Sequence, residues 1–212
     1  MTTDETIAAL RDLGAATVYE AQGGRGAVDS GIKPIDPNSR LAGRALTIDT
    51  APADNLMFHY ALLKARPGDV LVVDAKGFLE AGPWGDILTE AAIARGIAGL
   101  VTDGAVRDAA SIEAMGFPVF CRGLSIKGTG KNHLGRVGGP VILGGVNVQP
   151  GDVVVGDRDG VVVVPAAEAD TVLAKAQRRA EKEEDFRQAI REGRSTVELL
   201  GLADTLLQLG LD

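Results

Sequence analysis

Residues 86–121 read DILTEAAIARGIAGLVTDGAVRDAASIEAMGFPVFC and contain a helical pattern followed by a short apolar run, twice over. We predict helices over 86–95 and 105–115, and strands over 97–102 and 117–121, because short apolar runs between turn signals are typical of buried strands. Strands that alternate with helices indicate an α/β fold with a partly parallel sheet.

The sequence on either side of this stretch fits the same fold class. A β-branched run follows the turn residues Pro67-Gly68-Asp69, and the same order recurs after Pro150-Gly151-Asp152. Asp157 to Gly160 is a hairpin turn between the last two strands. The remaining predicted elements are helices over 4–22 and 55–64, a loop over 23–40, and strands over 41–51, 70–73, 141–143, 152–156 and 161–164.

From residue 166 the composition changes. Residues 166–192 are rich in Ala, Glu, Lys and Arg and predict one long helix, and Ser195 begins a shorter leucine-rich helical segment after Gly193. We therefore divide the chain into a domain over 1–165 and a C-terminal helical extension over 166–212. The apolar stripe of the extension must be buried, either on its own domain or across a subunit interface.

Composition excludes several classes of protein. With 22 Lys and Arg against 29 Asp and Glu, the 212-residue chain carries a net charge of −7 and is a poor partner for nucleic acid. Cys121 stands alone and cannot form an intramolecular disulfide. The sequence shows neither a basic-apolar leader nor the run of about 18 apolar residues that a membrane helix needs, so we expect a cytoplasmic protein without a membrane partner.

Several apparent motifs do not support a site. The glycines of 123–128 have the spacing of a phosphate-binding loop, but Thr129 follows where such a loop has lysine. His59 and His133 are not part of a Cys–His cluster, which argues against a zinc site. His133 lies in a basic loop over 127–136 that is either solvated or holds an anion.

Two segments carry a chemically coherent set of residues. Gly85 and Asp86 begin a predicted helix, whose free amide groups suit a carboxylate. Arg107 and Asp108 fall in the first turn of the next predicted helix, just past a strand end, where ligands bind in open α/β sheets. The two helix starts flank one strand and can share a crevice. Alternatively, Asp86 is only a helix cap and Arg107 with Asp108 only a surface ion pair.

The same residues resemble a known family. Asp86 and the pair Arg107-Asp108 are separated by 20 residues, 87–106, and Asp103-Gly104-Ala105-Val106 precedes the pair. This pattern, with the 150–165 hairpin and the helical tail, resembles the class II pyruvate aldolases. These are the 4-hydroxy-4-methyl-2-oxoglutarate and 4-carboxy-4-hydroxy-2-oxoadipate aldolases, which share a fold with RraA, the regulator of ribonuclease E activity.

The resemblance implies a role for each matching residue. Asp108 would bind Mg²⁺, Mn²⁺ or another divalent metal, and Arg107 would contact the keto oxygen of the substrate and stabilise an enolate. The backbone of Gly85, Asp86, Ile87 and Leu88 would hold the substrate carboxylate. Asp86 would also assist the water that serves as base.

The resemblance also implies a fold and an assembly. The fold would be a layered α/β/β sandwich of the RraA-like, swivelling-domain type, assembled as homotrimers or homohexamers with sites at subunit interfaces. Glu183 or Glu184 on the C-terminal helix would complete the site of a neighbouring subunit.

The activity implied is cleavage of a 4-hydroxy-2-oxo acid to pyruvate and a second oxo acid, with oxaloacetate decarboxylation beside it. Two alternatives stay open at this point. One is a non-catalytic regulator that binds a ribonuclease, and the other is a metal-dependent lyase or dehydratase acting on a sugar acid.

Overall fold

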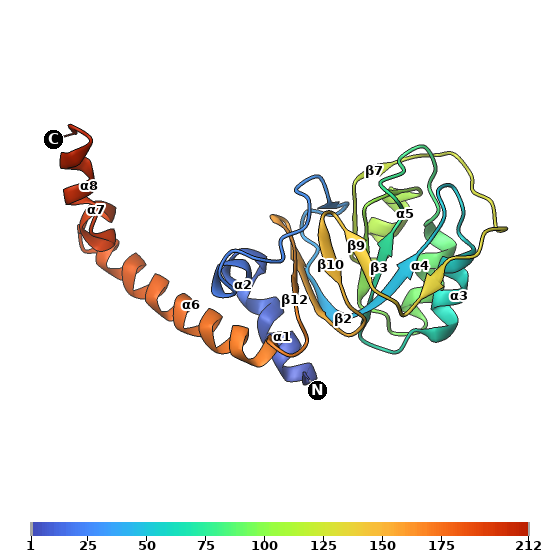
Figure 1. Ribbon diagram of the computed structural model, residues 1–212, viewed down its shortest axis with the longest axis horizontal. Coiled ribbons are helices and arrows are strands. Elements are labelled where there is room, and N and C mark those ends of the chain that lie inside the picture. Colours follow the sequence, from blue (N-terminus) through green and yellow to red (C-terminus); the bar gives the residue numbers. More distant parts are fainter. Residues whose placement is uncertain (1, 212) are drawn as a thin grey trace.

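Four parallel strands form the centre of the computed structural model, which describes residues 2–211 (Figure 1). They are β2 (Leu41–Asp49), β3 (Asp69–Asp74), β4 (Gly99–Thr102) and β6 (Val119–Cys121), in the order β6-β4-β3-β2. The inner residues of β3 and all of β4 are buried, as expected for strands covered on both faces. The predicted α/β class with a partly parallel sheet is therefore confirmed.

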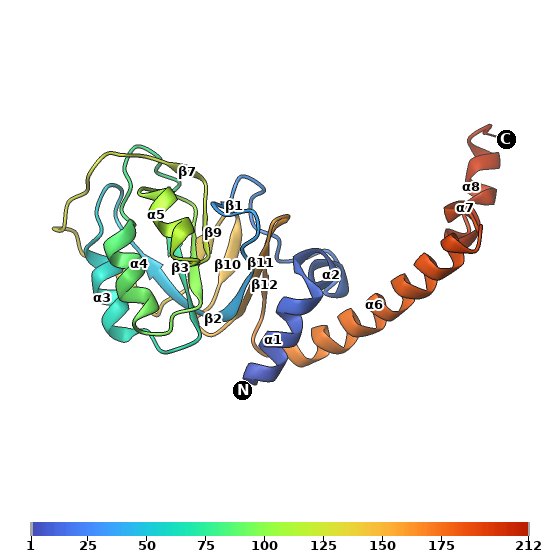
Figure 2. The ribbon, with the colours of Figure 1, turned by 180° about the vertical axis from the view of Figure 1, so that it is seen from behind.

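Three helices cover one face of this sheet (Figure 2). They are α3 (Leu56–Lys64), α4 (Asp86–Ile93) and α5 (Ala109–Ala114). Trp84 is completely buried beneath them, with ring centroids 5.9 Å from Phe58 and 6.1 Å from Phe117, and its indole N–H donates to Thr89 Oγ1 at 2.8 Å. This aromatic cluster joins α3 to the segment that begins α4.

Two antiparallel hairpins cover the opposite face; one of them continues the main sheet beyond β2, and the other is a separate two-stranded sheet. The hairpin of β11 (Val153–Asp157) and β12 (Gly160–Val164) pairs with β2, and β9 (Val141–Leu143) pairs with β10 (Val146–Val148). Apolar side chains of both hairpins and of the parallel strands share one core. The predicted hairpin turn is confirmed, whereas β10 was not predicted.

A further helical layer lies outside the β11–β12 hairpin. It consists of α1 (Asp4–Leu13), α2 (Ala15–Ala21) and the first turns of α6 (Ala169–Arg191), which pack on the outer face of the hairpin around a third apolar core. The expected RraA-like α/β/β layering is confirmed, and helices from both ends of the chain add to it.

The rest of α6 extends away from the body and carries the last two helices at its far end (Figure 1). These are α7 (Thr196–Leu200) and α8 (Ala203–Gln208), where Leu207 and Leu209 are 66% and 71% exposed. Within residues 2–211, no helix combines the length and apolar character needed to cross a membrane. The remaining short strands are β1 (Lys33–Pro34), β5 (Ala105–Val106), β7 (Gly123–Leu124) and β8 (Arg136–Val137).

Two predicted helices are wrong in their extent. The helix predicted over 4–22 breaks at Gly14, whose φ of +85° ends α1, and the Asp157 carboxylate accepts the amide of Ala15 at 2.8 Å. The helix predicted over 105–115 begins only at Ala109, because Ala105 and Val106 form β5 and pair with β7. Arg107 and Asp108 therefore precede the helix instead of lying in its first turn.

Removal of the Trp84 side chain should destabilise the fold strongly. We expect Trp84→Ala to lower the free energy of unfolding by about 3–5 kcal/mol, because it leaves a cavity among α3, α4 and Phe117. The control Leu63→Ala, on the exposed side of α3, should change it by less than about 0.5 kcal/mol. Urea unfolding measures both, and equal small losses would show that the cluster does not stabilise the helical layer.

Candidate active site

The structure brings the two predicted segments together. The Asp86 amide donates to Asp108 Oδ2 at 3.3 Å, and the Arg107 amide donates to the carbonyl of Trp84 at 2.9 Å. Arg107 Nε lies 3.3 Å from the same Asp108 oxygen, and both side chains are partly exposed. The segments that follow β3 and β4 thus form one wall at the carboxyl end of the parallel sheet, where α/β folds bind ligands.

Gly85 permits this close approach. A Cβ at this position would lie 2.3 Å from Asp108 Oδ2 and 3.1 Å from Arg107 Nε, so any larger residue must displace the acid and the arginine. The φ of Gly85 is −152°, which every residue can adopt. The requirement for glycine here is therefore steric.

A cavity of about 200 Å³ opens at this wall. Its lining is Asn55, His59, Pro83, Gly85, Asp86, Ile87, Leu88, Arg107 and Lys131. Asp86 lies in the first turn of α4, where the helix dipole favours a negative charge and the first amide groups have no partner within the helix. The Asp86 amide donates to Asp108 and the Ile87 amide to Asp86 Oδ1 at 2.7 Å, so the site offers a small anionic ligand the Leu88 amide and two cationic side chains beside one carboxylate.

His59 enters the site as a neutral side chain. Partial burial lowers the pKa of its imidazole below 6.5, and the nearby positive charge of Lys131 lowers it further. At neutral pH the ring therefore has one N–H donor and one nitrogen acceptor to offer a ligand.

Asp108 has the chemistry of a magnesium ligand. Mg²⁺ is commonly held by one or two carboxylates and several waters. The Asp108 side chain is 35% exposed, and within residues 2–211 only its Oδ2 is engaged, which leaves Oδ1 available to a cation. No group of three His, Cys, Asp or Glu side chains in that range converges on a metal site, so Asp108 is a single candidate ligand.

Glu183 and Glu184 lie elsewhere. Both are on α6, which packs on α1 and α2 and extends from the side of the molecule opposite α3 and α4 (Figures 1 and 2). Their carboxylates pair with arginines of the same helix, for example Glu183 with Arg179 at 3.0 Å. Neither residue belongs to the site of its own chain, and a role in a neighbouring subunit stays a prediction.

Asn55, His59 and Lys131 were not predicted as site residues. Asn55 and His59 come from the start of α3, and Lys131 comes from the long connection between β7 and β8. The basic loop over 127–136 was the one sequence signal, left open between a solvated loop and an anion site. Only the tertiary fold brings Lys131 of this loop to the cavity beside Gly85.

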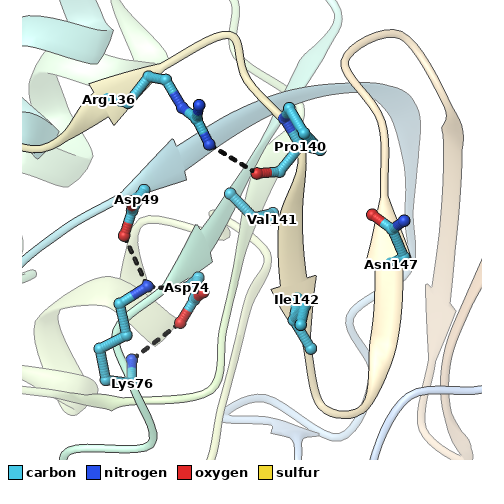
Figure 3. A pocket seen from close by; sticks show the side chains of 8 residues that line it. All are labelled: Asp49, Asp74, Lys76, Arg136, Pro140, Val141, Ile142 and Asn147. Carbon is cyan, nitrogen blue, oxygen red and sulfur yellow. Dashed lines mark hydrogen bonds and ion pairs between the residues drawn. The ribbon is translucent and has the colours of Figure 1, made fainter.

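A second cavity, of about 400 Å³, lies between the ends of β2 and β3 and the β9–β10 hairpin (Figure 3). The charged side chains that line this second cavity already have partners in the protein. Lys76 Nζ is 2.6 Å from Asp49 Oδ1 and 2.8 Å from Asp74 Oδ2, and Arg136 donates to the Pro140 carbonyl at 3.2 Å. We therefore place the candidate site at the smaller cavity, which is lined by Arg107, Asp86 and a Lys131 that is unpaired within residues 2–211, and where Arg107 keeps N–H donors beyond its contact with Asp108.

Cys121 is a buried residue of the apolar core, as predicted. It is buried at the end of β6, and burial raises the pKa of its thiol to about 11. The thiol therefore stays protonated at neutral pH and is not an activated nucleophile.

Asp54 anchors the connection that carries Lys131. Its carboxylate is 1% exposed and accepts the amides of Leu56 at 2.9 Å, Asn132 at 2.7 Å and His133 at 3.2 Å. Burial alone raises the pKa of this acid, but the bonds from Asn132, Leu56 and His133 outweigh burial and lower the pKa from 3.8 to about 2.

The structure is that of an α/β protein with a candidate site for a small anion at the carboxyl ends of its parallel strands. A model of the RraA-like family, described as Aldolase/RraA, matches residues 8–163. The chain belongs to this family.

The similar proteins include one named as an aldolase, one described as an RraA family member and one that is uncharacterised. The chain is 39% identical over 184 residues to a Halalkalibacterium halodurans protein named "Putative 4-hydroxy-4-methyl-2-oxoglutarate aldolase", covering 87% of this chain and 88% of that one. It is 32% identical to Streptomyces coelicolor RraAS2, described as an unusual member of the RNase ES inhibitor RraA family, with a TM-score of 0.80 over 89% of this chain and 100% of that one. It also resembles an uncharacterised Pseudomonas syringae protein, with 29% identity and a TM-score of 0.82 over 93% and 97% of the two chains.

The lowered pKa of Asp54 predicts a pH dependence of stability. A carboxyl group whose pKa falls on folding stabilises the native state above its unfolded pKa, and that contribution is lost as the pH falls through the folded value. We expect Asp54→Asn to lower the free energy of unfolding at pH 5 by about 1–2 kcal/mol, with the difference from wild type shrinking between pH 4 and pH 2.

Urea unfolding at pH 5 and pH 2.5 measures this difference. The matched control is Asp12→Asn, which removes a carboxylate that is 68% exposed and should follow wild type at both pH values. A constant difference between wild type and Asp54→Asn would contradict the assignment.

Proposed function

We propose that this chain is a divalent-metal-dependent aldolase that cleaves a 4-hydroxy-2-oxo acid to pyruvate and a second oxo acid. One observation carries the proposal: the Asp108 carboxylate and the Arg107 guanidinium lie together against Gly85, at the start of α4. The reaction breaks the C3–C4 bond and leaves its electron pair as a pyruvate enolate. The site must therefore bind a carboxylate and stabilise charge that develops on the neighbouring keto oxygen.

The carboxylate of the substrate fits the beginning of α4. The Leu88 amide lies in the first turn, and this end of the helix is electropositive, whereas the Ile87 amide donates to Asp86 Oδ1 at 2.7 Å and must exchange that acceptor for the substrate. Bound there, the substrate places its keto oxygen toward Arg107. Leu88 is buried beneath the turn and holds its backbone in place.

Arg107 stabilises the enolate. Its guanidinium keeps further N–H donors beyond the contact of Nε with Asp108, and these donors serve the keto oxygen as its charge grows. Asp108 holds the guanidinium in position while itself serving as the metal ligand. The bound cation would supply Lewis acidity toward the carboxylate and keto oxygens of the substrate.

Asp86 serves the proton transfers. Its partly buried carboxylate lines the cavity beside Arg107 and orients a water, which takes the proton of the 4-hydroxyl as the C3–C4 bond breaks. The same water returns a proton to C3 of the enolate, which yields pyruvate. Loss of CO₂ from oxaloacetate leaves the same enolate, so decarboxylation should accompany the aldolase reaction.

Binding to a ribonuclease is the second candidate function. The similarity to the Streptomyces coelicolor RraAS2 fold favours it. Such a function depends on an outer surface and does not need an arginine and an acid packed around Gly85. An assay of Arg107 variants therefore separates the two functions.

Trimeric or hexameric assembly remains part of the proposal. The exposed leucines of α7 and α8 lie at the end of a long helix that carries them away from their own domain. Helices of five and six residues are marginal by themselves, so contact with another subunit is expected to stabilise them.

Pyruvate release, coupled to lactate dehydrogenase, tests the proposed function. We expect release from 4-hydroxy-4-methyl-2-oxoglutarate and from oxaloacetate with Mg²⁺ or Mn²⁺, and none with EDTA. Arg107→Ala should lower kcat at least about 10²–10³-fold with the fold intact, because it removes the donor to the enolate oxygen. Arg11→Ala, on an exposed arginine of α1, is the control and should be fully active.

Full activity of Arg107→Ala would remove Arg107 from the mechanism. Absence of pyruvate from folded wild-type protein under every condition would favour a sugar-acid lyase or the ribonuclease-binding function.

The metal requirement should depend on Asp108. Asp108→Asn keeps the shape of the side chain against Gly85 but removes its charge, so activity should be lost or need a much higher Mg²⁺ concentration. A Mg²⁺ titration of pyruvate release measures the shift. Glu90→Gln, on an exposed carboxylate of α4, is the matched control. An unchanged titration for Asp108→Asn would locate the metal at other residues.

A further inference from the structure

The connection between β7 and β8 lacks regular structure but forms part of the candidate site. From Ser125 to Gly135, its one β-type contact is an isolated bridge between Gly130 and Asp54. It nevertheless brings Lys131 to the cavity, and within residues 2–211 the Lys131 ammonium has no ion-pair partner. Something other than a sheet or a helix must hold this cation in place.

Asp54 supplies the attachment. Its Oδ1 accepts the amide of Leu56 in the first turn of α3, whereas its Oδ2 accepts the amides of Asn132 and His133 and lies 3.2 Å from His133 Nδ1. One buried carboxylate therefore binds the start of α3 with one oxygen and the residues beside Lys131 with the other.

Asn55 extends the attachment to the opposite wall. Its amide donates to the Gly130 carbonyl at 3.0 Å, and its side-chain Nδ2 donates to the Pro83 carbonyl at 3.0 Å, two residues before Gly85. The adjacent residues 54 and 55 thus tie the loop of Lys131 and the loop of Gly85 to the same helix end. The distance between the two walls of the cavity is set at this point.

We infer that Asp54 is a positioning residue, which holds Lys131 over the candidate site so that its ammonium faces the bound anion. This inference rests on the proposed function for its kinetic consequences. Asp54 does not touch the ligand. It acts because three contacts from Asn132 and His133 to its buried carboxylate replace the regular structure that the loop lacks, while a fourth, from the Leu56 amide, fixes that carboxylate to α3. A charged acceptor makes such hydrogen bonds stronger than a neutral one does.

The experiment is a cycle of variants at Asp54 and Lys131. Asp54→Asn places an NH₂ group or a weaker acceptor opposite the Asn132 and His133 amides and should release the loop. We expect KM to rise on the order of tenfold or more, with a smaller change in kcat. Lys131→Gln should raise KM similarly, and the double variant should be no worse than Lys131→Gln alone, because Asp54 acts through Lys131.

Asp152→Asn is the matched control. Asp152 is also buried and accepts two backbone amides, from Gln149 at 2.8 Å and Ala166 at 3.0 Å, at the turn before β11. It should lose stability as Asp54→Asn does but keep the KM of wild type. His133→Ala is a milder variant on an exposed side chain, and its smaller rise in KM should likewise vanish beside Lys131→Gln.

Additive effects of Asp54→Asn and Lys131→Gln on KM, or an equal rise for Asp152→Asn, would overturn the inference. If wild type releases no pyruvate, the proposed function fails, and hydrogen exchange decides the positioning role separately. Residues 128–135 should then exchange faster in Asp54→Asn but not in Asp152→Asn. Unchanged exchange in Asp54→Asn would contradict the role whatever the reaction is.

Discussion

A single carbon added to Gly85 would lie 2.3 Å from the Asp108 carboxylate, and the candidate site depends on this close contact. The Asp108 and Arg107 side chains can lie against the segment after β3 because Gly85 has no side chain, and a Cβ there would force them to shift. Trp84 holds the two segments together, since its side chain is fully buried and its backbone carbonyl accepts the Arg107 amide. The contact places one acid, one arginine and the first turn of α4, with the Leu88 amide, around a space suited to a small anion.

The layers of the fold follow from apolar patterns that are visible in the chain. The buried runs of β3 and β4 and the helical segments between them predicted the parallel sheet, and the Asp157–Gly160 turn predicted the last hairpin. Element boundaries predicted from local patterns were wrong where a contact with a distant residue determines the backbone conformation. Gly14 ends α1 because Asp157 accepts the next amide, and β5 forms because β7 lies beside it. Neither partner is adjacent in sequence.

The candidate site was likewise predictable only in part. Gly85, Asp86, Arg107 and Asp108 have a recognisable spacing, and the structure brings them together. Asn55, His59 and Lys131 have no such signal, because residues 54 and 55 bring α3 and an irregular loop to the site through buried hydrogen bonds. The proposed catalytic groups thus lie at the ends of regular elements, whereas the residues that shape the cavity depend on side-chain contacts between loops.

The central claim is that this site forms and protonates a pyruvate enolate, and exchange of the pyruvate methyl protons with solvent tests it most directly. The experiment follows the methyl signal of pyruvate by NMR in D₂O, with the protein and Mg²⁺, and needs no knowledge of the physiological substrate. We expect deuterium incorporation that stops with EDTA and in Arg107→Ala. Absence of exchange in folded wild-type protein with Mg²⁺ or Mn²⁺, or equal exchange in Arg107→Ala, would contradict it.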